Sequence, residues 1–173
     1  MSDDPAVHEW CCASCGEIHT DLPALVISAP AIWFDAIEAE PARDLELTSD
    51  TCRWRDEGFF VRSIRARPFS KREGGMEFGV WSSRSQESLF RSMTQFENPE
   101  RTGLGWKFGG FSNRRPGYPD TENLKRHVDP REPGLRPAIE LEPTEHPLAA
   151  QQREGITFEE ACPRARAFGT LKP

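Results

Sequence analysis

The stretch that decides the fold is TCRWRDEGFFVRSIRARPFSKREGGMEFGVWSS, residues 51–83. Residues 51–55 and 58–67 read as two paired strands, because the tight turn Asp56-Glu57-Gly58 joins them. In residues 76–82, Phe78 and Val80 alternate with Gly79 and Trp81, which predicts a third strand with both faces partly covered. A small set of neighbouring strands is therefore the expected centre of the fold.

Helix signals lie on both sides of this stretch. Ser83 precedes Gln86 by three residues, which is the spacing of a capping box, and an apolar helical repeat follows until Asn98-Pro99. Pro30 and Pro41 bracket another apolar segment, which predicts a helix between them. Thr157 is the expected cap of the last helix. The apolar positions of the two better-marked helices are Leu89, Phe90, Met93 and Phe96, and Phe158, Ala161, Ala165 and Phe168.

Further segments complete the expected architecture. Residues 105–112 and 136–141 predict strands, and residues 144–153 predict a short helix that Gly155 ends. Short strands and helices that do not alternate as β and α indicate an α+β fold with a mainly antiparallel sheet and flanking helices. We expect a flexible leader over residues 1–10 and a single α+β domain over residues 11–170.

Composition limits the classes of partner. The net charge is −6 and the pI about 5.3. A nucleic-acid-binding protein usually carries a basic stripe, so this acidic balance argues against that role. A membrane span needs a run of about 20 apolar residues, and the sequence contains none. The acidic start lacks the features of a signal peptide. We therefore expect a cytoplasmic protein that binds neither nucleic acid nor membrane, with a protein or a small molecule as its partner.

The sharpest local motif is Cys12-Ala13-Ser14-Cys15-Gly16, near the amino terminus. Two thiolates at this spacing can bind one zinc ion, and the glycine permits the left-handed backbone of a tight knuckle. A structural zinc site needs four ligands, for which His19 is the nearest further candidate and Cys52 the best distant one. Cys11, His127 and His146 are alternatives. Zinc is thus the expected cofactor, in an N-terminal zinc-knuckle-like turn.

Two other interpretations of this motif stay open. Cys12 and Cys15 can be reduced thiols in a turn, without any metal. They can also form a thiol-based metal or redox sensor, although the strand–helix context of a thioredoxin motif is missing.

A second polar segment holds candidate catalytic residues. Ile139 and Leu141 lie on one face of the predicted strand and Glu140 and Glu142 on the other, and His146 follows about a turn later. Paired carboxylates beside an imidazole can perform acid–base chemistry where burial shifts their pKa values. The simpler interpretation is a solvated strand face, with His146 shaping the corner beside Pro147.

A third segment, residues 113–121, combines cations, an aromatic ring and turn residues. Arg114, Arg115 and Tyr118 are the candidate binding residues for an anion or a peptide. Turn chemistry accounts for most of the pattern, because Pro-Gly and Pro-Asp set the backbone without a ligand. The sequence contains neither the Gly-x-Ser-x-Gly elbow of hydrolases nor a Walker or dinucleotide glycine motif.

Several of these segments, in order, resemble one bacterial family. They are Cys12-x-x-Cys15-Gly16-x-x-His19, Leu22-Pro23, Phe78-Gly79-Val80-Trp81-x-Ser83, Tyr118-Pro119-Asp120-Thr121-x-Asn123-Leu124-Lys125, and the run from Arg136 to Gln152. Together they resemble the domain-of-unknown-function family 2199 over roughly residues 12–160. The resemblance implies a small bacterial protein and supplies no activity.

These patterns give three candidate functions. The first is a non-enzymatic binding or interaction protein with a structural zinc knuckle. The second is a small enzyme that uses Glu140, Glu142 and His146, with Arg114 or Arg115 binding an anion. The third is the thiol-based metal or redox sensor.

Overall fold

A computed structural model describes residues 10–11, 16–19, 22, 24–39, 44–71, 73–104, 107–115 and 117–167. The helices are α1 (Ala31–Ala39), α2 (Gln86–Thr94), α3 (Pro147–Glu154) and α4 (Phe158–Ala167), with a 3-10 turn at Arg101–Leu104. The strands are β1 (Trp10–Cys11), β2 (Ile18–His19), β3 (Leu25–Val26), β4 (Leu45–Leu47), β5 (Thr51–Trp54), β6 (Gly58–Pro68), β7 (Gly75–Arg84), β8 (Lys107–Gly110), β9 (Lys125–Asp129) and β10 (Ala138–Leu141).

One eight-stranded sheet organises the molecule and confirms the α+β class. Its main path is β3-β7-β6-β10-β9-β8, with β5 also pairing with β6 and β4 pairing with β5. The sheet is mixed rather than purely antiparallel, because β3 runs parallel to β7 and β10 runs parallel to β6. Both parallel pairs join segments far apart in the sequence, so no local turn motif predicts them.

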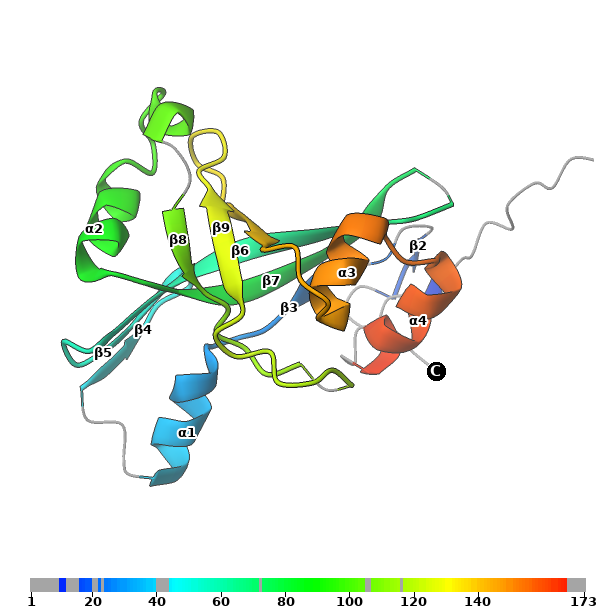
Figure 1. Ribbon diagram of the computed structural model, residues 1–173, viewed down its shortest axis with the longest axis horizontal. Helices are drawn as coiled ribbons and strands as arrows, with labels where there is room; N and C mark the ends of the chain where they lie inside the picture. Colours follow the sequence, from blue (N-terminus) through cyan, green and yellow to red (C-terminus); the bar gives the residue numbers. More distant parts are fainter. Residues whose placement is uncertain are drawn as a thin grey trace, which may run out of the picture.

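The predicted strands of residues 51–83 are confirmed and form the centre of the sheet. β5 pairs with β6 across the expected turn, and β6 pairs with β7 from Phe59↔Arg84 to Pro68↔Gly75. The β6–β7 hairpin therefore runs the length of the molecule (Figure 1).

The helix ends follow local capping chemistry. The N-cap of α2 is Ser85 and not Ser83, because β7 continues to Arg84; the Ser85 hydroxyl accepts from the Ser88 amide at 3.2 Å. Thr157 caps α4 as predicted. Its hydroxyl accepts from the Glu160 amide at 3.2 Å, and the Glu160 carboxylate accepts from the Thr157 amide at 2.8 Å.

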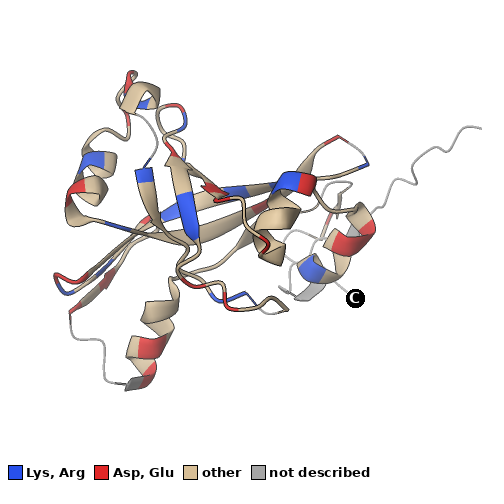
Figure 2. Cartoon of the chain, viewed as in Figure 1, with Lys and Arg blue, Asp and Glu red and all other residues tan. Residues whose placement is uncertain are grey.

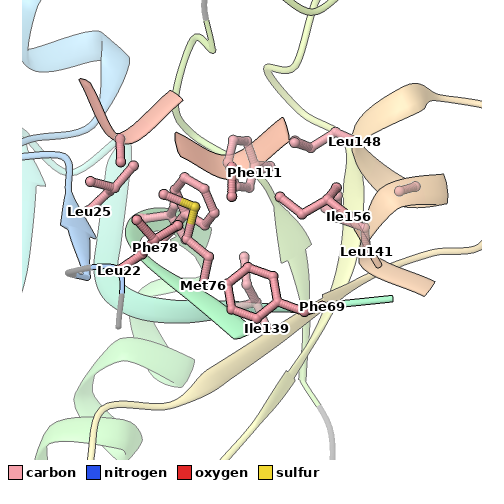
Figure 3. Close-up of a cluster of buried hydrophobic side chains, with 14 of the residues drawn as sticks. Leu22, Leu25, Phe69, Met76, Phe78, Phe111, Ile139, Leu141, Leu148 and Ile156 are labelled. Atoms are coloured by element: carbon pink, nitrogen blue, oxygen red, sulfur yellow. The ribbon is translucent and has the colours of Figure 1, made fainter. Parts of the chain in front are cut away.

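The main core lies between one face of the sheet and the C-terminal helices. Met76, Phe78 and Phe111 share this interior with Leu148 and Ile156 (Figure 3). Burial of these side chains provides most of the driving force that holds α3 and α4 on the sheet.

The two ends of the β6–β7 hairpin are covered differently. α3 and α4 lie toward one end, and α2 lies at the other (Figure 1). The α2 end has only a small separate core of Phe59, Val61 and Leu89. Phe90 and Met93, which belong to the apolar helical repeat of α2, are 52% and 51% exposed. Thus α2 covers its end of the sheet incompletely.

Among the described residues, no helix combines the length and apolar character that crossing a membrane requires.

Candidate functional site

The two polar segments noted in the sequence lie against each other. The Tyr118 hydroxyl, in the loop after Phe111, donates to Oε1 of Gln151 on α3 at 2.6 Å. His146, just before α3, lies with its Nε2 3.1 Å from the carbonyl oxygen of Asp120. The loop and the start of α3 therefore form one continuous region.

Next to this contact lie four arginines that we call the guanidinium cluster: Arg65 and Arg67 on β6, Arg115 in the loop after Phe111, and Arg164 on α4. Three of them gather around one ring. The guanidinium carbons of Arg65, Arg67 and Arg115 lie 5.2, 5.0 and 4.4 Å from the centroid of Phe78. The cluster thus lies in the main core.

Strand geometry places the two β6 arginines there. Alternate residues of a strand share a face, and in β6 the buried face carries Phe59, Val61, Ser63, Arg65 and Arg67. Figure 2 shows basic positions within the strands of the sheet as well as in the helices and loops. The inward face of β6 therefore changes from apolar at its start to cationic at its end.

Tyr118 closes the other side of the cluster. Its ring lies 5.9 Å from the guanidinium carbon of Arg67 and 5.2 Å from that of Arg164. Nη1 of Arg164 also donates to Oε1 of Gln151 at 3.2 Å, the atom that accepts from Tyr118. Ring faces attract cations, but they offer no hydrogen-bond acceptor comparable to a carboxylate.

Arg67 is the member of the cluster with the fewest hydrogen bonds from its guanidinium group. It is 0% exposed, and its Nε, Nη1 and Nη2 have no hydrogen-bond partner among the described residues. Arg65, 1% exposed, donates from Nη1 to the Leu148 carbonyl oxygen at 3.5 Å, while its Nη2 has no partner there. Within the described part of the chain, no carboxylate forms an ion pair with either side chain.

The pKa values reflect this environment. Burial lowers the pKa of Arg67 to about 10, and the charge of Glu160 opposes that shift. Burial also lowers the pKa of Arg115 to about 10, with Arg67 and Arg164 acting in the same direction. Burial, followed by the charges of its three neighbours, holds the pKa of Arg65 well below its ordinary value. Each guanidinium is thus disfavoured by desolvation, and for Arg65 and Arg115 neighbouring cations add to the effect.

The candidate binding residues separate into two groups. Arg115 and Tyr118 belong to the cluster region, whereas the exposed Arg114 binds carboxylates at the surface. Arg114 donates to both carboxylate oxygens of Asp35 at 2.6 Å, and its Nε lies 2.5 Å from Oε1 of Glu122. The hydrogen bond from Arg114 lowers the pKa of Asp35. Arg114 is therefore already paired.

The candidate catalytic residues lie at the edge of this region. As predicted, Ile139 and Leu141 are buried while Glu140 points outward. Glu142 is half-buried, with Oε1 3.9 Å from Nε2 of His127.

His146 is the N-cap of α3 and uses both ring nitrogens. Nδ1 accepts from the Leu148 amide at 3.1 Å, which leaves the ring proton on Nε2 to donate to the Asp120 carbonyl oxygen. These contacts favour the structural interpretation of His146.

The candidate metal ligands are only partly described. Cys12 and Cys15 lie outside the described residues. β1 and β2, on either side of them in the sequence, pair antiparallel with Trp10 opposite His19, and Gly16 has φ +76°, the left-handed backbone predicted for it. Among the described residues, no three His, Cys, Asp or Glu side chains group as a metal site.

Cys52 lies far from this hairpin. It is fully buried in β5, at the opposite end of the molecule from β2 (Figure 1). Burial raises the pKa of its thiol to about 11, so the thiolate that zinc needs is disfavoured. The structure therefore does not bring Cys52 and His19 together.

Sequence reasoning did not identify Arg65, Arg67 or Arg164 as site residues. Arg65 and Arg67 recur with period two in a predicted strand, and that signal also describes a solvated face. One signal in the sequence could have identified them. Phe59, Val61, Arg65 and Arg67 occupy alternate positions of the same strand, so the arginines lie on the face that Phe59 and Val61 bury.

Comparison with known proteins identifies a family and no activity. No curated protein and no solved structure matches the chain. One family model, described as an uncharacterized protein conserved in bacteria (DUF2199), matches residues 11–156. This match includes every strand except part of β1, together with α1, α2 and α3, and stops just before α4. The chain therefore belongs to the bacterial family DUF2199.

Proposed function

We propose that this protein is a non-enzymatic binding protein and that its guanidinium cluster binds a phosphate-type oxyanion. The observation that carries the proposal is Arg67, fully buried with three guanidinium nitrogens that have no hydrogen-bond partner among the described residues. A guanidinium group presents a planar fork of donors that recognises phosphate and carboxylate oxygens.

The free-energy cost of burying the Arg67 guanidinium supports this proposal. Removing a charge from water costs several kcal/mol even after the protein relaxes, and the cost is recovered only when an opposite charge and hydrogen bonds replace the water. The charge of Glu160 offsets part of this cost at Arg67. The Glu160 carboxylate, however, also accepts a hydrogen bond from the Thr157 amide in the cap of α4. A bound anion would offset the remaining cost.

The chemistry favours a multivalent oxyanion over a monovalent one. Arg65, Arg67 and Arg164 come from two different elements and lie against two rings, Phe78 and Tyr118, and we propose that donors from both elements contact the anion. A tetrahedral phosphate presents oxygens in several directions, whereas a planar carboxylate satisfies one arginine fork. The phosphate can be free or part of a larger molecule.

The enzyme alternative has weaker support. Its imidazole is engaged at both nitrogens, and Glu140 is solvent-exposed. A general base needs a free acceptor within reach of a substrate proton.

The test is thermal unfolding at increasing inorganic phosphate, in a buffer otherwise free of oxyanions. The wild-type Tm should rise and then saturate as phosphate binds the folded state. Arg67→Met should lose this response. Arg114→Met is the matched control, because Arg114 lies in the same loop as Arg115 but is exposed, and it should respond as the wild type does.

Two results would overturn the proposal. One is an equal Tm increase from chloride at matched ionic strength, which indicates charge screening. The other is a phosphate response that survives in Arg67→Met. Phenyl phosphate tests the source of the group, since a response to the monoester that exceeds the response to free phosphate indicates a larger ligand.

A structural zinc ion at Cys12 and Cys15 remains part of the proposal. The pairing of β1 with β2 and the left-handed Gly16 support a knuckle between those strands, with His19 on the second strand. Elemental analysis should find one zinc per chain, lost when both cysteines are changed to serine, and a chelator should lower the Tm. Protein purified without chelators that contains no zinc would remove this part of the proposal.

A further inference from the structure

A second cationic region lies under α2 and adjoins an accessible hollow. The outer hollow, which we call the α2 groove, has a volume of about 320 Å³ and runs between α2, β6 and the turn from β4 to β5. The inner hollow, the cationic chamber, measures about 20 Å³. Ser92, Arg101 and Pro137 line both, so the chamber and the groove adjoin.

The α2 groove offers mainly apolar contacts. Val61, Met93 and Phe96 line it, and Met93 is 51% exposed. Four charged residues also line the groove: Asp50, Arg62, Arg101 and Arg136. Arg136 donates from Nε to Asp50 at 2.5 Å, and Arg62 and Arg101 donate to the carbonyl oxygens of Ser49 and Leu135 at 2.9 and 2.8 Å. The groove therefore suits an apolar group rather than another charge.

The cationic chamber has the opposite character. Its described lining includes Arg84, Arg91, Arg101 and Lys107 and no acidic residue. Arg101 donates from Nη1 to the carbonyl oxygens of Phe96 and Leu135, at 3.2 and 2.8 Å. Arg84, 8% exposed, keeps Nε and Nη1 without a hydrogen-bond partner among the described residues. Arg84 is therefore the cation in this chamber best able to receive a ligand.

Size separates the classes of anion. A cavity of about 20 Å³ has room for one or two water-sized groups. That suits the two oxygens of a carboxylate on one arginine fork, and it is small for a phosphoryl group with its further oxygens. The groove outside lies within the volume range of small-molecule sites, about 300 to 1,000 Å³.

We propose that the α2 groove binds a monocarboxylate with an apolar chain, its carboxylate paired with Arg84 and its chain lying against Val61, Met93 and Phe96. In this proposal the ligand extends from the groove past Ser92, Arg101 and Pro137, which border both hollows, to reach Arg84. This site lies at the opposite end of the β6–β7 hairpin from the guanidinium cluster and does not depend on it.

The experiment is calorimetric titration with octanoate, below its micelle concentration, and with 1-octanol as the uncharged match. The wild type should bind one octanoate per chain and bind 1-octanol about ten- to a hundredfold more weakly, because hydrogen bonds to charged groups are the stronger ones. Arg84→Met should remove this preference. Met93→Gln should weaken both ligands, because it places an amide along the apolar wall.

Two controls separate this site from the other one. Arg114→Met and Arg67→Met should both bind octanoate as the wild type does. Equal affinity for octanoate and 1-octanol in the wild type, or no binding of either, would overturn the proposal. An octanoate preference that survives in Arg84→Met would also overturn it. If that variant does not fold, the comparison of octanoate with 1-octanol in the wild type still tests the proposal.

Discussion

The two ends of the β6–β7 hairpin both bury arginines, but they satisfy them differently. At the α2 end, backbone carbonyls accept from most of them. Arg126 donates from Nη2 to the Ser83 carbonyl oxygen at 2.7 Å and from Nε to that of Gly110 at 3.3 Å. At the α3–α4 end, Arg67 has aromatic faces and no such acceptor among the described residues.

This difference separates structural arginines from ligand-binding ones. A guanidinium that donates to fixed carbonyls ties strands together and needs nothing more. A guanidinium that is buried without acceptors lowers the stability of the fold until an anion supplies them. By this criterion Arg101 and Arg126 are structural, whereas Arg67 and Arg84 are candidates for ligand binding.

The largest effect should come from removing the ring shared by the cluster. Phe78→Ala deletes a fully buried side chain, and truncations of this kind cost about 3–5 kcal/mol. It should also abolish the phosphate response, because Arg65, Arg67 and Arg115 lose their common support. Urea unfolding followed by tryptophan fluorescence measures the loss.

Phe111→Ala is the matched control, since Phe111 is equally buried in the same core. It should lose comparable stability and keep the phosphate response. If both variants keep that response, Phe78 has no role in arranging the cluster.

A smaller effect is expected at the α2 end from Gly109→Ala. The added methyl would lie against the Ser83 carbonyl oxygen and 2.6 Å from Nη2 of Arg126, so it disrupts the bond between them. Crowding of this kind costs about 1–3 kcal/mol.

Gly103→Ala is its control, because a methyl there meets nothing within 4 Å among the described residues. The phosphate response should persist in both glycine variants. An unchanged free energy of unfolding in Gly109→Ala would show that the carbonyl contacts of Arg126 contribute little.

His146→Ala tests whether that residue is structural or catalytic. Loss of the cap of α3 should cost about 0.5–2 kcal/mol. His146→Asn should recover most of the stability, since asparagine is a good N-cap residue. Failure of asparagine to recover any stability would point to a role for the imidazole beyond capping.

The smallest effect concerns pH. The pKa of Arg67 is lowered to about 10 in the folded protein, below its ordinary value of 12.5. As the pH approaches 10, the folded chain begins to lose this proton while the unfolded chain keeps it, so stability begins to rise with pH. The difference in stability between Arg67→Met and the wild type should therefore shrink by a few tenths of a kcal/mol from pH 8 to pH 10. Denaturation at the two pH values measures it, and a widening difference would contradict the assignment.

Local patterns in the sequence predicted the frame of this fold well. The strands of residues 51–83, the cap at Thr157 and the alternation of Ile139 and Glu140 all depend on nearby residues. The parallel pairings of β3 and β10 depend on distant segments. The N-cap of α2 is Ser85 instead of the predicted Ser83, because β7 extends further than its apolar pattern.

The site was harder to predict for a physical reason. Arginine at alternate strand positions normally faces water, and only the packing of α3, α4 and the Tyr118 loop buries Arg65 and Arg67. Arg115 and Tyr118 were identified from turn and charge patterns alone. Their neighbours on β6 and α4 required the tertiary structure.

The most direct test is the stability of Arg67→Met against the wild type at pH 7, in a buffer without oxyanions. If Arg67 is a buried cation kept for a ligand, methionine should raise the free energy of unfolding by about 1–4 kcal/mol, as replacing buried charged groups with apolar ones often does. A variant that is less stable than the wild type under these conditions would contradict the account, because the arginine would then be stabilised by the protein itself.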